Sequence, residues 1–124
     1  MEDLEKQIRS FIAATILVHT ACVSYSLTES ENLQNSKYAF DLTDVLKAAD
    51  RATRAFSYID RNKIKGIFND TVKENLLSLI DAAIVKIGET IEFLHKVKTE
   101  NQKEVLNKVS SLVDDLELLR ETTR

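Results

Sequence analysis

Apolar residues recur every three or four positions along four long segments of this chain. The segments cover residues 3–27, 38–59 (or 41–59), 70–98 and 101–121, each bound being approximate. Such spacing places apolar side chains on one side of an α-helix. The pattern therefore predicts four amphipathic helices, with polar connections at 28–37 and 60–69.

Residues that interrupt regular backbone are scarce. The chain has no proline in 124 residues and only two glycines, Gly66 and Gly88. Long helices joined by short polar segments are typical of a four-helix bundle. We therefore expect one domain spanning residues 1–124, with an all-α, antiparallel, up-down-up-down bundle. The third helix should be the longest, and its extra turn should project or cover one end of the core.

Each predicted helix carries one apolar stripe that is expected to form the core. The first stripe contains Leu4, Ile8, Phe11, Thr15, Val18, Cys22 and Tyr25, and the second contains Leu42, Val45, Leu46, Ala49, Ala52, Phe56 and Ile59. The third contains Leu76, Ile80, Ala83, Ile87, Thr90, Leu94 and Val97, and the fourth contains Val105, Val109, Leu112, Leu116 and Leu119.

The first helix is apolar on more than one side. Ile12, Ile16 and Val23 form a second stripe, with Leu17 nearby. A bundle buries one stripe of each helix, so a second stripe favours burial against another subunit. We therefore expect a homo-oligomer, in the simplest case a homodimer, formed through this helix.

Local signals suggest where helices begin and which side chains pair. Asn69 or Asp70 suits the N-cap of the third helix. Asn101 and Glu104 resemble a capping box at the start of the fourth. Asp50 and Arg54 have the order and spacing of a favourable pair within the second helix. Gly88 should cost that third helix about 1 kcal/mol relative to alanine, unless another backbone packs closely there.

Composition indicates a soluble protein. The net charge is −3, and the single cysteine, Cys22, cannot form an internal disulfide. The most apolar stretch, 11–27, contains His19 and four hydroxyl residues and is shorter than the roughly 20 residues of a spanning helix. We expect a buried helix, no membrane span and a cytoplasmic location.

No pattern of catalytic or metal-binding residues emerges. Glu92 and His95 have the spacing of one half of a ferritin-like di-iron site, but the second half and the further glutamates are missing. Cys22 lies on the inward stripe, where a thiol behaves as a small apolar group. The sequence also lacks a glycine-rich phosphate-binding loop. We therefore expect no cofactor, no metal and no enzymatic activity.

Histidine phosphotransfer is an alternative function. His95 is followed three positions later by Lys98, a spacing that resembles that of histidine phosphotransfer domains, which are also four-helix bundles. The small residues that those domains place beyond the lysine are absent here. His19 has small neighbours but no lysine nearby. This alternative requires an exposed histidine in the middle of a helix.

A basic run is the main candidate for partner contact, and the alternative is a solvated helix face that happens to be basic. Six basic residues and two acidic ones lie between Lys47 and Lys65, a local net charge of +4. The candidate contact residues are Lys47, Arg51, Arg54, Tyr58, Arg61, Lys63 and Lys65. An acidic protein is favoured over nucleic acid, because the chain as a whole is acidic. A nucleic-acid accessory role stays as a second alternative.

The sequence thus predicts a non-enzymatic helical module for protein-protein interaction or assembly, which associates with itself. It does not identify the partner, and it does not fix the order of the helices around the bundle.

Overall fold

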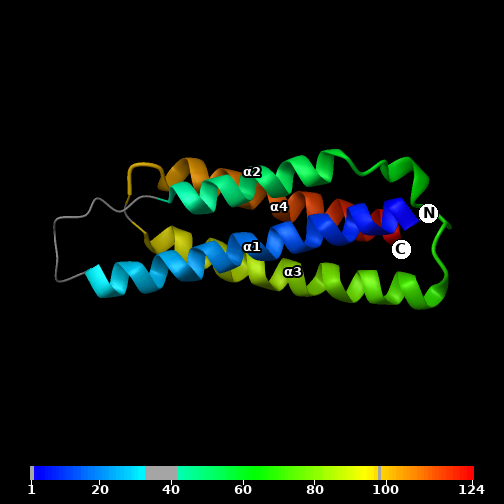
Figure 1. Cartoon of the computed structure of the whole chain (residues 1–124), viewed down its shortest axis with the longest axis horizontal. Helices are drawn as coiled ribbons and strands as arrows, with labels where there is room; N and C mark the ends of the chain where they lie inside the picture. Colours follow the sequence, from blue (N-terminus) through cyan, green and yellow to red (C-terminus); the bar gives the residue numbers. More distant parts are fainter. Residues whose placement is uncertain (1, 33–41, 98) are drawn as a thin grey trace.

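The computed structural model describes residues 2–32, 42–97 and 99–124. These ranges contain four long helices: α1 (Glu2–Asn32), α2 (Thr43–Ser57), α3 (Asp70–Lys96) and α4 (Gln102–Thr123). A short 3-10 helix, η1 (Arg61–Lys63), follows α2. No β-strand occurs in the described ranges. The predicted all-α four-helix bundle is confirmed (Figure 1).

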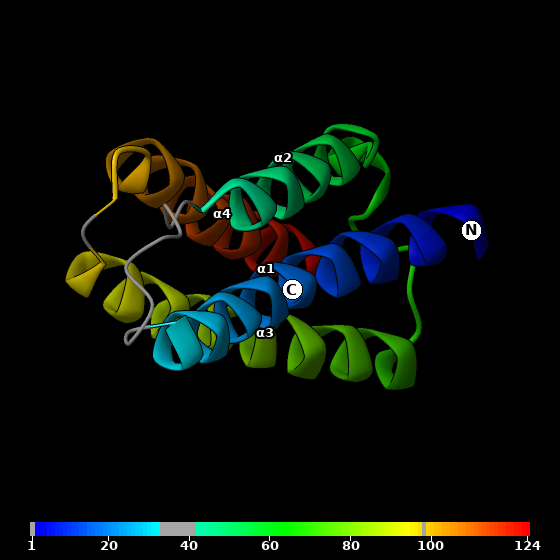
Figure 2. The same ribbon diagram turned by 60° about the vertical axis from the view of Figure 1, so that its left-hand side comes forward.

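Successive helices alternate in direction, as predicted (Figures 1 and 2). The main contacts join α1 to α2, α3 to α4, α1 to α3 and α2 to α4. The order around the bundle is therefore α1, α2, α4, α3, which leaves α2 and α3 diagonally opposite. The neighbours α1 and α3 run parallel, since His19 meets Glu89 near the middle and Tyr25 meets Phe93 further along.

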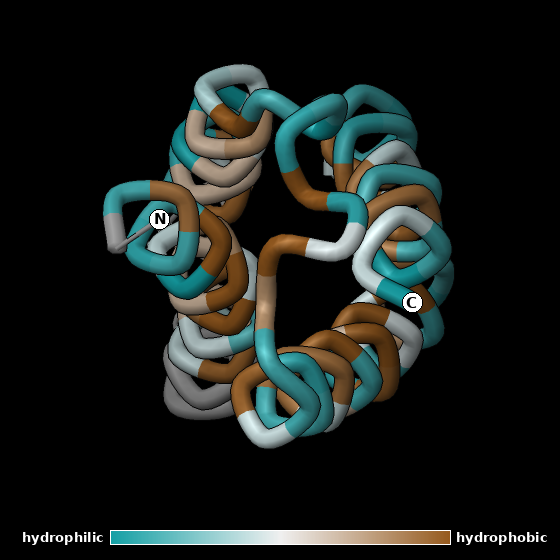
Figure 3. Tube along the Cα trace, turned by 90° about the vertical axis from the view of Figure 1, so that its right-hand side faces the viewer, coloured by the Kyte–Doolittle hydropathy of each residue, from teal (hydrophilic) through white to brown (hydrophobic). Residues whose placement is uncertain are grey.

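The connection between α2 and α3 follows from this order. Residues 58–69 cross one end of the bundle, between α1 and α4, to reach the opposite corner (Figure 3). Ile59 and Ile64 of this crossing segment are only 6% and 1% exposed. These two side chains cover that end of the core. The sequence had suggested the extra turn of the third helix for this role.

All four predicted stripes reach the core. Every predicted position of α3 and α4 is buried, as are Leu4, Ile8, Phe11, Thr15, Val18 and Cys22 of α1. Leu42, Val45, Ala49, Ala52 and Ile59 are buried around α2, while Tyr25, Leu46 and Phe56 are half-buried against the same cluster.

The predicted helix bounds need three corrections. α1 continues through Asn32, so the first part of the expected connection at 28–37 is helical. With 31 residues α1 is longer than α3, which has 27. α2 begins at Thr43 and ends at Ser57, and the earlier starts suggested by the sequence lie outside the described residues.

Two side-chain predictions are also corrected. Asn101 does not cap α4 with its side chain, because its Oδ1 accepts hydrogen bonds from the Leu42 N–H (3.2 Å) and the Thr99 hydroxyl (3.0 Å). Asp50 pairs with Lys108 of α4 rather than with Arg54. In both cases a group from a neighbouring segment takes the place of the local partner.

The predicted N-cap of α3 is confirmed at Asn69. Its side-chain oxygen accepts a hydrogen bond from the Val72 N–H at 2.9 Å. At the other end of α3, the Gln102 side-chain amide donates to the Leu94 carbonyl at 2.8 Å. Each end of the helix therefore has a side chain that satisfies one of its free backbone groups.

We predict that Ile64→Ala lowers the free energy of unfolding by about 2–5 kcal/mol, because it empties a filled site at the end of the core. Urea denaturation followed by circular dichroism measures this change. The control is Lys65→Ala, an exposed position next to it. Equal stability of the two variants would show that the crossing segment does not seal the core.

Substitution of the two glycines by alanine is expected to change stability in opposite directions. Gly66 has a φ of +73°, which is unfavourable for alanine, so Gly66→Ala should lower stability by about 1–2 kcal/mol. Gly88 is exposed within α3, and no atom lies within 4 Å of an added Cβ. Gly88→Ala should therefore raise stability by about 1 kcal/mol. Thermal unfolding of both variants gives the two signs.

Candidate functional site

The residues predicted to contact a partner lie along α2 and the start of the crossing segment. All seven are exposed, and we call them the basic face: Lys47, Arg51, Arg54, Tyr58, Arg61, Lys63 and Lys65. Their spacing places Lys47, Arg51, Arg54 and Tyr58 on one side of α2. That side is opposite to the side that buries Val45, Ala49 and Ala52.

The two acidic residues within this run, Asp50 and Asp60, do not pair with Lys47, Arg51 or Arg54. Asp50 accepts a hydrogen bond from Lys108 of α4. Asp60 lies 3.9 Å from the Lys63 amine, and its other oxygen accepts a hydrogen bond from the Asn62 N–H at 3.1 Å. Within the described residues, Lys47, Arg51 and Arg54 make no ion pair. Most of the positive charge therefore faces solvent.

Arg61 is fixed to the body of the bundle. Its guanidinium lies over the ring of Phe56, 5.6 Å from the ring centroid, and Phe56 packs against Phe11 of α1 at 5.1 Å. The Arg61 charge also acts on the Asp115 carboxyl of α4. Through the ring of Phe56, Arg61 thus links η1 to α2, and Phe56 in turn contacts Phe11 of α1.

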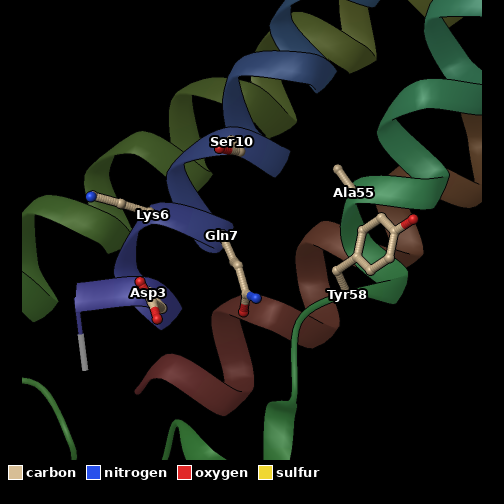
Figure 4. Close-up of a pocket in the computed structure, with 6 residues that line it drawn as sticks. All are labelled: Asp3, Lys6, Gln7, Ser10, Ala55 and Tyr58. Atoms are coloured by element: carbon tan, nitrogen blue, oxygen red, sulfur yellow. The ribbon is translucent and has the colours of Figure 1, made fainter.

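Tyr58 stands at the end of this face with its side chain 72% exposed, the largest exposed fraction among the large apolar residues of the described chain. Beside it an open hollow of about 330 Å³ lies between the start of α1 and the end of α2. Asp3, Lys6, Gln7 and Ser10 line the hollow from α1, and Ala55 and Tyr58 line it from α2 (Figure 4). Figure 4 shows Lys6 directed away from α2 and Gln7 directed toward it.

The second apolar stripe expected on the first helix is divided. Ile12 is buried in the core and Ile16 is half-buried against it, so these two do not form an outer surface. Leu17 and Val23 are 57% and 44% exposed. Together with the exposed residues Ala13 and Thr20, they form what we call the outer face of α1.

Two further large apolar residues are exposed, and sequence reasoning missed both. Val85 of α3 is 60% exposed and Leu118 of α4 is 43% exposed. Neither residue falls on the core stripe of its helix, and this position could have predicted from the sequence that both are exposed. Each stands among charged positions, such as Asp81 and Glu89 near Val85, so neither forms an apolar surface.

Neither histidine has the position that phosphotransfer requires. His95 is exposed but lies in the last turn of α3, and Lys98 lies outside the described residues. His19 is in the middle of α1, but its side chain is only 20% exposed, and its Nε2 lies 3.3 Å from the Glu89 carboxylate. Phosphotransfer therefore gains no support from this geometry.

The described residues considered for nucleophilic and metal chemistry are Cys22, Glu92 and His95. Burial raises the pKa of the Cys22 thiol to about 11, so the thiol stays protonated at neutral pH. Glu92 and His95 are both exposed on α3. Among the described residues, no three histidine, cysteine, aspartate or glutamate side chains gather as a metal site would require.

The Asp115 carboxyl gives a pH-dependent prediction. Burial raises its pKa, the neighbouring Asp114 raises it further, and Arg61 opposes both. The folded protein therefore binds this proton more tightly than the unfolded chain, and stability falls as the pH rises through the interval between the two pKa values. Asp115→Asn should raise the melting temperature at pH 7.

The gain in melting temperature from Asp115→Asn should disappear below about pH 4, where the Asp115 carboxyl is protonated in both the folded and the unfolded state. Differential scanning calorimetry at pH 3 and pH 7 tests this. The control is Glu117→Gln, an exposed carboxyl on the same helix. A gain at pH 7 that is as large at pH 3 would exclude ionisation as its cause.

In the part of the chain that the structure describes, one helix is long and apolar enough to cross a membrane by length and composition alone, over Asp3–Tyr25 of α1. The core helix of a soluble protein passes the same test. Comparison of the chain with protein families, with curated proteins and with solved structures gives no match. Its function must therefore be argued from its own surfaces.

Proposed function

We propose that this chain is a non-enzymatic helical interaction module of the cytoplasm, which associates with its own copies through the outer face of α1. The observation that supports self-association most directly is the lack of charged residues on that surface. From Ser10 to Tyr25 the chain has no aspartate, glutamate, lysine or arginine, yet Ala13, Leu17, Thr20 and Val23 are exposed.

The chemistry of this surface favours a second copy of the chain. A two-fold symmetric interface places the same patch of both subunits in contact, so the patch must complement itself. An uncharged surface of small, hydroxyl and aliphatic residues meets this requirement without like-charge repulsion. The basic face does not, because it would bring cations against cations. Leu17 is 57% exposed, so burying its exposed part contributes about 1–2 kcal/mol.

The packing of α1 also favours a location in water over a location in a membrane. Six residues of α1's inner stripe, from Leu4 to Cys22, are already buried among the other helices. Insertion of α1 into a bilayer would remove them from that core. A soluble dimer keeps the core intact and covers only the exposed side.

The basic face gives a second candidate contact, with a different protein. The observation that favours it is that Lys47, Arg51 and Arg54 project together without ion-pair partners in the described structure, next to the exposed ring of Tyr58. Arginine and tyrosine are enriched at the residues that dominate binding energy in protein interfaces.

We expect Leu17→Lys to convert a dimer into a monomer, because two lysines would meet at the symmetric interface. Sedimentation velocity over a concentration series measures the change. The matched control is Val85→Lys, which places the same charge on an equally exposed aliphatic position of α3 and should leave the association unchanged.

Two outcomes would contradict the proposal. One is a parent protein that sediments as a monomer at the highest concentration. The other is equal weakening by both substitutions, which would indicate a general effect of charge. Recovery of the parent protein with uncharged phosphatidylcholine vesicles, lost on Leu17→Lys, would instead assign the outer face of α1 to lipid.

A further inference from the structure

We infer that the basic face binds one acidic helical segment of another protein, laid along α2 with its end against Tyr58. This inference rests on the proposed role as an interaction module, but it does not depend on self-association through α1. The two surfaces lie on different helices, so separate variants can remove them separately.

The width of the basic face indicates the shape of its partner. Lys47, Arg51 and Arg54 form a ridge one helix wide, about 10 Å long from Lys47 to Arg54 at the usual rise per residue. A helix that carries carboxylates at positions i, i+4 and i+7 presents them with the same spacing. Such a segment can place one carboxylate near each cation.

The surroundings of the ridge disfavour broader anionic partners. Asp44 is exposed in the first turn of α2, Asp114 is exposed on the neighbouring α4, and Asp3 lines the hollow on the α1 side. A nucleic-acid duplex or an anionic membrane would extend past the ridge onto these carboxylates and be repelled. A single acidic helix that begins at Lys47 and runs toward Tyr58 covers a narrower strip of this surface and stops short of Asp44.

Tyr58 supplies the apolar end of the contact. Its ring is exposed to solvent, and the hollow beside it leaves room on the α1 side. An aliphatic side chain of the partner can therefore pack against the ring and against Ala55 without any movement of the helices. Charged groups then set the orientation and rate of binding, while Tyr58 contributes contact area.

The test uses the full-length protein and a fluorescein-labelled synthetic helical peptide. The peptide carries glutamates at positions i, i+4 and i+7 and a leucine at i+11, and a second peptide has glutamine in place of each glutamate. Fluorescence anisotropy measures binding at low and at physiological salt. We expect the glutamate peptide to bind, the glutamine peptide to bind at least tenfold more weakly, and added salt to weaken the first.

Variants then locate the contact. Arg51→Gln with Arg54→Gln should weaken binding about tenfold, and Tyr58→Ala should weaken it by a similar factor. The matched control is Lys86→Gln with Lys96→Gln, which makes the same change in net charge on the exposed side of the diagonally opposite α3. Circular dichroism confirms that each variant is folded.

The inference is overturned if the two peptides bind equally, or if the control pair of substitutions weakens binding as much as the α2 pair. It is also overturned if a double-stranded oligonucleotide, or vesicles containing phosphatidylserine, bind more tightly than the glutamate peptide and lose that binding in the α2 variants. The Leu17→Lys protein should still bind the peptide, which separates a failure here from a failure of self-association.

Discussion

Ile59 and Ile64 hold the connection between α2 and α3 across one end of the bundle, and the placement of the surfaces depends on that crossing. Both side chains are buried on a segment that carries three basic residues, Arg61, Lys63 and Lys65. Apolar burial thus fixes the path of a strongly polar stretch. Because the path is diagonal, α2 and α3 occupy opposite corners instead of adjacent ones.

This arrangement separates the two candidate surfaces. α2 lies between α1 and α4, so only its outer side, with Lys47, Arg51 and Arg54, is left to solvent. α1 lies between α2 and α3, and its uncharged outer side is exposed as well. The uncharged surface and the basic surface therefore lie on two different helices that are neighbours in the bundle.

The rings at the α1–α2 contact connect the basic face to the core. Phe11 packs on Phe56, and Phe56 in turn carries the guanidinium of Arg61. A cation over an aromatic ring contributes about 0.5–1 kcal/mol at an exposed site. Arg61 is therefore held in place, whereas the α2 cations are free to adjust to a partner.

The periodicity of the sequence determined the helices, their inward stripes and the identity of the exposed cations, because a repeat of 3.6 residues relates each position to one side of a helix. Residue type also narrowed the N-cap of α3 to Asn69 or Asp70, and the structure has Asn69 in that position. Periodicity says nothing about which helices become neighbours, so the parallel contact of α1 with α3, the pairing of Asp50 with Lys108 and the use of Asn101 by Leu42 arose only in the tertiary structure. The same limit applies to the second stripe of α1, since burial of Ile12 and exposure of Leu17 depend on where the neighbouring helices lie.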